Sequence, residues 1–152
     1  MSDSSTPAFR RAVVALNGGT SDARIVRLVS ELARPAKAEL IAVHVVEIDW
    51  TLPLDADIAG RSEEVQRVLD IAETVAEGSH VTLEPVLLQA RDVGAAIVDE
   101  AIERDADLLV VGLPYRKRFG GEFAIGRTIP YILQNAPCAV WVVRDPINEE
   151  SS

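Results

Sequence analysis

The sequence predicts an α/β protein built on a parallel β-sheet with helices on both faces. Short apolar runs alternate with longer amphipathic stretches along the 152 residues, and this alternation is typical of strands and helices that follow one another along the chain. Several of the runs are continuously apolar, as in strands that are buried on both faces. We therefore expect neighbouring parallel strands to be joined by right-handed crossovers.

The composition is typical of a single soluble domain and argues against a nucleic-acid-binding protein. The length fits one domain, with 48% hydrophobic and 26% charged residues. A net charge of -9 argues against a nucleic-acid binder, which needs a basic surface. The single cysteine, Cys138, excludes an internal disulfide. No secretory signal is recognisable, and the apolar runs are far shorter than the roughly 20 residues of a membrane helix. We therefore expect a soluble, cytoplasmic protein without membrane insertion.

The chain is expected to begin its folded part with a strand and a helix. A β-rich run at 12–16 ends at an Asn-Gly-Gly turn signal. Thr20 or Ser21 can cap the helix that follows, and Pro35 ends it. Helical spacing predicts that four apolar residues form the inward face of this helix: Ile25, Leu28, Val29 and Leu32.

The middle of the chain predicts two further strands around a second helix. Residues 40–46 are almost continuously apolar and are followed by a loop at 47–60. A helix then runs from Ser62 to Gly78, where the glycine ends it. The run at 81–88 alternates at first and contains a proline, which indicates an edge strand.

The last part of the chain predicts helix, strand, helix and strand. Asp92 is expected to cap a helix at 93–103. The inward residues of that helix are expected to be Ile97, Val98, Ala101 and Ile102. The remaining strand, helix and strand are expected at 106–112, 126–135 and 139–143.

Four stretches resemble the universal stress protein family. They read ALNG at 15–18, ELIAVHVVE at 39–47, ADLLVVG at 106–112 and NAPCAVWVV at 135–143. The resemblance implies a doubly wound, Rossmann-like fold of the adenine nucleotide alpha hydrolase type, with five parallel strands in the order 3-2-1-4-5. Ligands of such folds bind at the carboxyl ends of the strands where the order reverses. We expect a single domain at 9–145 between disordered tails at 1–8 and 146–152.

Other stretches resemble the branch of that family that is often fused to the cytoplasmic end of amino-acid transporters. They read TLPLDA at 51–56, LQARDVG at 88–94, GLPY at 112–115 and GRTIPY at 126–131. The resemblance implies a free-standing relative of that branch, for which a membrane transporter is a candidate partner.

The glycine motif of the family is present in altered form. In ATP-binding members, glycine, two residues, glycine, nine residues, glycine and Ser or Thr wrap the phosphates and ribose, and an acid follows the first strand. This chain has Gly112 and Gly126, but Tyr115 replaces the middle glycine and the spacing to Gly126 is one residue longer. Arg127 precedes Thr128 at the motif's end, and Asn17 replaces the acid.

The resemblance and a basic loop still predict a site for an adenine nucleotide or another phosphate ligand. A glycine that opens a helix presents backbone amides to an anion, and Arg116 and Arg118 can contact phosphate. ATP or another adenine nucleotide is the expected cofactor, with Mg²⁺ only as a companion of ATP. The expected nucleotide-binding residues are Leu16, Asn17, Gly18, Val45, Gly112, Leu113, Gly126, Arg127 and Thr128. In the alternative interpretation the loop is a solvated segment, and Tyr115 and Phe119 fill the pocket.

No pattern in the sequence supports catalysis. Two distant histidines and one cysteine cannot assemble a soft-ligand metal site, and we expect His44 to be structural. Neither a nucleophile elbow nor a Walker motif is present. We therefore expect a non-enzyme, with slow ATP hydrolysis the least favoured activity.

The last strand would leave an apolar edge bare, which favours pairing with a second copy. The family resemblance implies the same homodimer, through Val140, Trp141, Val142 and Val143. Two functions stay open: a stress-response regulatory module that binds a nucleotide, and a nucleotide-independent interaction protein that docks on a partner such as a transporter.

Overall fold

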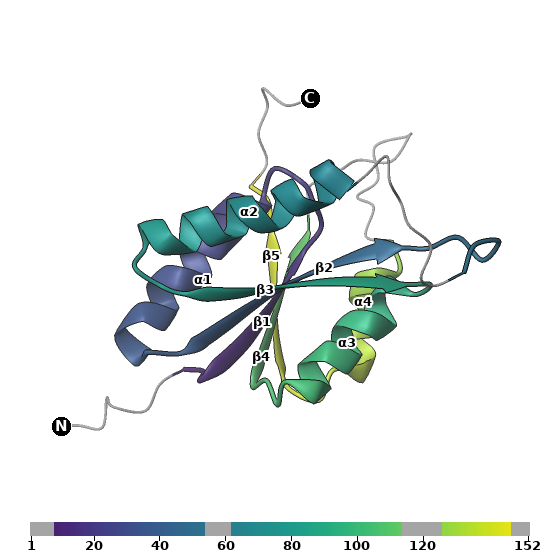
Figure 1. Ribbon diagram of the computed structural model, residues 1–152. Coiled ribbons are helices and arrows are strands. Elements are labelled where there is room, and N and C mark those ends of the chain that lie inside the picture. Colours follow the sequence, from purple (N-terminus) through teal and green to yellow (C-terminus); the bar gives the residue numbers. More distant parts are fainter. Residues whose placement is uncertain (1–7, 54–61, 114–125, 147–152) are drawn as a thin grey trace.

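The fold is a five-stranded parallel sheet with strand order β3-β2-β1-β4-β5. The computed structural model describes residues 8–53, 62–113 and 126–146. The expected fold class and strand order are therefore confirmed (Figure 1). In chain order the elements are β1 (Arg11–Leu16), α1 (Asp22–Ala36), β2 (Glu39–Glu47), α2 (Ser62–Gly78), β3 (Leu83–Ala90), α3 (Val93–Glu103), β4 (Leu108–Leu113), α4 (Thr128–Asn135) and β5 (Ala139–Arg144).

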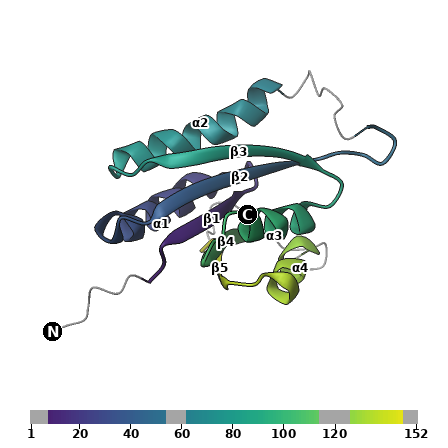
Figure 2. The ribbon, with the colours of Figure 1, turned by 60° about the horizontal axis from the view of Figure 1, so that its bottom comes forward.

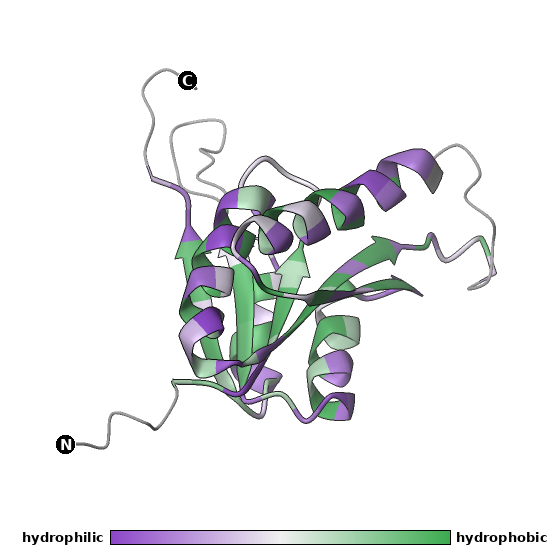
Figure 3. Ribbon diagram, turned by 60° about the vertical axis from the view of Figure 1, so that its left-hand side comes forward, coloured by the Kyte–Doolittle hydropathy of each residue, from purple (hydrophilic) through white to green (hydrophobic). Residues whose placement is uncertain are grey.

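Two helices cover each face of the sheet. Figures 1 and 2 show α1 and α2 on one side and α3 and α4 on the other. The neighbouring residues Val13 and Val14 of β1 are both fully buried, and they belong to the two opposite cores. This is why the apolar runs are continuous, since both faces of a central parallel strand need apolar side chains. The hydropathy colouring shows the apolar strands enclosed by helices whose outer faces are polar (Figure 3).

The buried faces of α1 and α3 differ in part from the expected ones. Leu28 and Leu32 of α1 are 44% and 46% exposed, and Ile102 of α3 is 56% exposed. Val26, Ser30 and Ala33 are buried beside Ile25 and Val29, which turns the buried face of α1 away from the two leucines. The buried residues of α1 are Asp22, Ile25, Val26, Val29, Ser30 and Ala33.

The first three helices end in the same hydrogen-bonded turn. In each, a non-glycine residue has positive φ: Lys37 (55°), His80 (61°) and Asp105 (53°). The next amide donates to a carbonyl five residues back, as from Ala38 to Ala33 at 3.1 Å, which defines a Schellman motif.

One expected helix end is wrong, because Pro35 lies within the last turn of α1 instead of ending it. Gly78 is the last residue of α2, as expected. The chain then reverses at His80, and β3 begins at Leu83 and not at residue 81.

Strands β3 and β5 form the two edges of the sheet. The edge position of β3 was expected from Pro85. On β5, the ring of Trp141 packs edge-on against Phe9, with 5.8 Å between ring centroids. The homodimer through β5 stays a prediction. In the described part of the chain no helix has both the length and the apolar character needed to cross a membrane.

Candidate functional site

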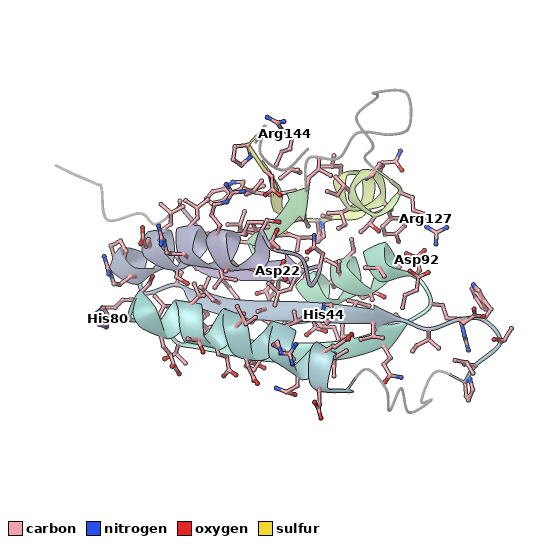
Figure 4. All side chains as sticks on the ribbon, turned by 90° about the horizontal axis from the view of Figure 1, so that it is seen from above. Asp22, His44, His80, Asp92, Arg127 and Arg144 are labelled. Atoms are coloured by element: carbon pink, nitrogen blue, oxygen red, sulfur yellow. The ribbon has the colours of Figure 1, made fainter. Side chains whose placement is uncertain are left out.

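The candidate site lies at the carboxyl edge of the sheet. Strands β1, β2 and β4 end there, and the order reverses between β1 and β4 because both β2 and β4 pair with β1. Seen from above, Asp22 and His44 lie near the middle of the molecule and Arg127 lies beside α4 (Figure 4). This edge is where doubly wound folds bind ligands.

A cavity of about 570 Å³ opens between the ends of β1 and β2 and the first turns of α2. Its volume is within the range of small-molecule sites, about 300–1,000 Å³. Helix α2 contributes apolar residues such as Val65 and Val68 to the cavity wall. The ends of β1 and β2 contribute polar residues such as Asn17 and His44. The lining residues are Asn17, Gly18, His44, Val45, Val46, Glu47, Glu64, Val65, Arg67, Val68 and Ile71. Three of the expected nucleotide-binding residues, Asn17, Gly18 and Val45, are therefore among them.

The loop between β1 and α1 is organised by Asp22. Its carboxylate accepts hydrogen bonds from the amides of Asn17 at 3.2 Å and Gly18 at 2.8 Å. The N-terminal capping residue of α1 is Ser21, whose side chain makes no capping hydrogen bond. Ser21 is thus the capping residue by position, but its hydroxyl makes no cap, and the carboxylate of Asp22 binds amides of the preceding loop instead of the helix. Sequence reasoning missed this role, and the only signal for it was an acid in the first helical turn.

Burial raises the pKa of the Asp22 carboxyl, while the two amides and nearby His44 act in the opposite direction. Asp22 is 8% exposed, so its charged form is poorly hydrated. The carboxylate occupies the position that a ligand anion would need in order to reach the same two amides. A phosphate is therefore not expected to bind the Asn17 and Gly18 amides.

Asn17 also stabilises the loop. Its side-chain oxygen accepts a hydrogen bond from the amide of Gly19 at 2.7 Å. Gly18 has φ of 82°, a left-handed conformation that favours glycine. A Cβ on Gly18 would lie 3.6 Å from Val68 Cγ2 and 3.8 Å from His44 Cε1. The glycine therefore permits the turn, and the space beside it is bounded by cavity residues.

His44 is a satisfied histidine, as expected, and it also lines the cavity. Its Nδ1 lies 3.1 Å from the carbonyl oxygen of Leu16. Because a carbonyl can only accept, Nδ1 carries the proton in this contact. In the neutral ring, Nε2 is then a hydrogen-bond acceptor. Leu16 thus contributes to the site through its backbone carbonyl, which accepts the hydrogen bond that orients the His44 ring.

The first motif glycine, Gly112, has a packing role. A Cβ at this position would lie 2.6 Å from Cδ1 of Ile25 on α1, so the glycine lets the end of β4 approach that helix. Gly112 and Leu113 are both half-buried in β4. Neither residue is among those that line the cavity.

The end of the motif lies at the start of α4. Gly126 has φ of 78°, and Arg127 is the N-terminal capping residue, so the helix begins at Thr128 and not at Gly126. Arg127 Nη2 lies 3.6 Å from Glu47 Oε2 at the end of β2. Gly126 and Thr128 do not line the cavity. The structure thus connects the β2 end with the motif's end through a side-chain ion pair.

Gly94 of α3, whose role the sequence did not indicate, allows α4 to pack closely against α3. A Cβ on Gly94 of α3 would lie 3.1 Å from Tyr131 Cδ1 and 3.4 Å from the Thr128 carbonyl oxygen. The absence of a side chain at residue 94 lets the first turn of α4 approach α3.

Several residues named in the sequence analysis lie outside the described residues, namely Arg116, Arg118, Tyr115 and Phe119. Within 8–53, 62–113 and 126–146, no group of three or more His, Cys, Asp or Glu side chains could hold a metal ion. Burial raises the pKa of the Cys138 thiol, which disfavours the reactive thiolate.

The sequence profile of the universal stress protein family matches residues 8–144. The chain belongs to the universal stress protein family. The wider family resemblance inferred from the four strand-bearing stretches is therefore confirmed.

Among curated relatives, this universal stress protein is 30% identical over 145 residues to the Sensor protein KdpD of Mycobacterium tuberculosis (strain CDC 1551 / Oshkosh). That match covers 95% of this chain and 16% of the sensor, so the chain spans about a sixth of its relative's length. The reported matches give no support to the finer resemblance to transporter-fused proteins.

Among the solved structures that share the fold are two nucleotide complexes. A universal stress protein in complex with cAMP has a TM-score of 0.68 and 23% identity, with coverage of 90% of this chain and 98% of that chain. The universal stress protein from Archaeoglobus fulgidus in complex with dAMP has a TM-score of 0.69 and 22% identity, with coverage of 88% and 97%. At these identities the likeness concerns the fold alone.

Proposed function

We propose that this universal stress protein is a regulatory module that binds an adenine nucleotide at the carboxyl edge of its sheet. The observation that carries the proposal is the cavity of about 570 Å³ beside the ends of β1 and β2. Its location matches the general ligand position of doubly wound folds. The nucleotide complexes of two proteins with this fold support the choice of ligand.

The base and ribose would occupy the cavity itself. Val65 and Val68 of α2 offer an apolar wall for a flat ring, and Val45 offers the backbone of β2. The side chain of Asn17 and Nε2 of His44 offer polar contacts, the latter as an acceptor suited to an amino or hydroxyl group. This arrangement of an apolar wall with few polar groups is typical of small-molecule sites.

The phosphates would extend toward Gly126, Arg127 and Thr128. The start of α4 offers backbone amides and the favourable end of the helix dipole, and Arg127 adds a guanidinium. Gly112 and Leu113 would border this path from β4. Any Mg²⁺ would enter only as a companion of ATP, because the described residues contain no metal-ligand cluster.

The proposal is tested by measuring nucleotide occupancy and nucleotide affinity on the same preparation of purified protein. We would release retained small molecules by denaturation, identify them by mass spectrometry, and titrate stripped protein with adenosine, AMP, cAMP and ATP by calorimetry. Val65→Trp should fill the cavity and abolish binding, because Val65 lines it from α2. Thr74→Trp on the exposed side of the same helix is the control and should bind normally. Equal binding by both variants would place the ligand elsewhere.

We expect binding without turnover. The described residues contain no group of three or more side chains that could hold a metal ion, and His44, which lines the cavity, is engaged through Nδ1 with the carbonyl of Leu16. Release of phosphate at rates above those of the Val65→Trp variant would contradict this expectation.

A second candidate function is a nucleotide-independent interaction module that docks on a partner such as a membrane transporter. The favouring observation is Trp50, which is 80% exposed after β2. Arg91 lies 4.9 Å from the centroid of its ring and donates hydrogen bonds at 2.7 Å to the carbonyls of Asp49 and Leu52. A fixed, exposed tryptophan suits the centre of a protein interface.

The two functions give different results with Trp50→Ala. An interaction module would lose its partner in a pulldown whether or not nucleotide is present, while nucleotide affinity would stay unchanged. A nucleotide-responsive module would show partner binding that changes with added nucleotide and is altered by Val65→Trp.

A further inference from the structure

Glu47 belongs both to the candidate cavity and to an ion pair with the start of α4. It is the last residue of β2 and lines the cavity. Its Oε2 lies 3.6 Å from Nη2 of Arg127, which is too long for a good hydrogen bond but within ion-pair range. The two side chains are 55% and 87% exposed, so water screens the pair and a ligand could break it. Arg127 thus faces a carboxylate of the protein in the region proposed for phosphate.

The charges around the cavity are balanced in the described residues. Glu47, Glu64 and Arg67 line the cavity, and Arg127 lies beside Glu47. A phosphate therefore meets no excess of positive charge there. A phosphate that binds Arg127 competes with Glu47 for the guanidinium, and the carboxylate remains close to the ligand's own negative charge.

We propose that Glu47 competes with the ligand for Arg127 and thereby makes the site prefer adenine ligands of low negative charge. The inference rests on the proposed function and adds the charge class of its ligand. The competition has no effect on adenosine, a small effect on AMP, and the largest effect on ATP, because repulsion grows with the charge brought near the carboxylate. Glu47 is a specificity-determining residue in this account.

The test compares the dissociation constants of adenosine, AMP and ATP for the wild type and for Glu47→Gln, Arg127→Gln and the double variant. Glu31→Gln is the matched control, because Glu31 is also an exposed acid in a weak surface pair, 4.0 Å from Arg27 on α1. Glu31→Gln also removes one negative charge, but at a residue that does not line the cavity. Thermal unfolding of each variant checks that the fold is retained.

We expect Glu47→Gln to tighten ATP binding by about three- to tenfold, AMP binding less and adenosine binding not at all. The gain should shrink at high salt and should be smaller in the Arg127→Gln background, where no guanidinium is left to compete for. Glu31→Gln should leave the ratio of ATP to adenosine affinity unchanged. Binding by Glu47→Gln alone, with none by the wild type, would also support the proposal.

Three results would overturn it. An unchanged ratio of ATP to adenosine affinity in Glu47→Gln would remove Glu47 from ligand selection while leaving the nucleotide site in place. An equal gain with and without Arg127 would show simple repulsion and no competition. No binding of any ligand by the wild type or any variant would refute the proposed function, and this inference with it.

Discussion

The carboxylate of Asp22 accepts a hydrogen bond from the amide of Gly18 at 2.8 Å, across the turn that joins β1 to α1. The same carboxylate accepts from the Asn17 amide. A side chain of the protein therefore satisfies the amides that end β1 at the switch point. This contact fixes the turn beside the cavity and directs the proposed phosphate toward α4.

The Asp22 contact predicts a particular pH dependence of stability. Burial raises the pKa of this carboxyl in the folded protein. The folded state therefore holds the proton more tightly than the unfolded state, and the stabilisation is present below the unfolded pKa and lost as pH rises through the folded pKa. Asp22→Asn removes this effect. The free energy of unfolding of the wild type minus that of Asp22→Asn should fall between pH 3 and 7, measured by urea denaturation.

Asp99→Asn on the exposed face of α3 is the control for that experiment. The difference in free energy of unfolding between the wild type and Asp99→Asn should not show the same decrease with pH. A wild-type advantage that grows with pH at Asp22 would show that the two amide hydrogen bonds outweigh burial.

Glycine at the helix ends should stabilise the fold. Lys37 has φ of 55° and His80 has φ of 61°, a region in which glycine is less strained. Lys37→Gly and His80→Gly should each raise the free energy of unfolding by about 0.5–1 kcal/mol, measured as the urea midpoint at unchanged slope. Lys37→Ala keeps the strain and should give no gain. A loss with glycine would mean that the lysine side chain itself contributes to the cap.

Removing the hydroxyl of Ser30 should also stabilise the protein. Ser30 is fully buried in α1, and its Oγ has no hydrogen-bond partner in the described part of the chain. An unsatisfied buried hydroxyl costs about 1–3 kcal/mol, and alanine has the higher helix propensity. Ser30→Ala should raise the free energy of unfolding by about 1 kcal/mol. If Ser30→Ala instead lowers the free energy of unfolding by a similar amount, a bound water satisfies the hydroxyl.

The contact between Gly112 and Ile25 predicts a rescue experiment. A Cβ at residue 112 would lie 2.6 Å from Ile25 Cδ1. Because Cδ1 is the tip of its side chain and can move, Gly112→Ala should destabilise by about 1 kcal/mol through overpacking. Ile25→Val removes that Cδ1 and should recover part of the loss in the double variant. Additive losses would show that Gly112 is needed for another reason.

The sequence predicts the strands better than the site because strand burial is visible in composition. The continuous runs of β1, β2 and β4 indicate two-sided burial without any tertiary information. The site depends on contacts between residues far apart along the chain, and no local pattern reports them. The Glu47–Arg127 pair and the close approach of Gly94 to Tyr131 are of this kind.

Local rules failed at the helix ends for a related reason. Pro35 suits the last turn of α1 as well as a helix stop, and the hydrogen bonds of Lys37 and Ala38 decide between the two. Similarly, Asp22 looks like an ordinary first-turn acid until its burial and its two amide donors are known. The altered glycine motif was visible in the sequence, but the packing of Gly112 against α1 was not.

The most direct test of the central claim is an amide NMR titration of the ¹⁵N-labelled protein with AMP. If AMP binds at the carboxyl edge, the amides of Gly18, Val45 and Val68 should shift together with those at the start of α4, with one shared affinity. The amides of Val81 and Thr82, which line a groove at the opposite edge of the sheet, should not move. Shifts confined to that opposite groove, or none at saturating AMP, would contradict a nucleotide site at the carboxyl edge.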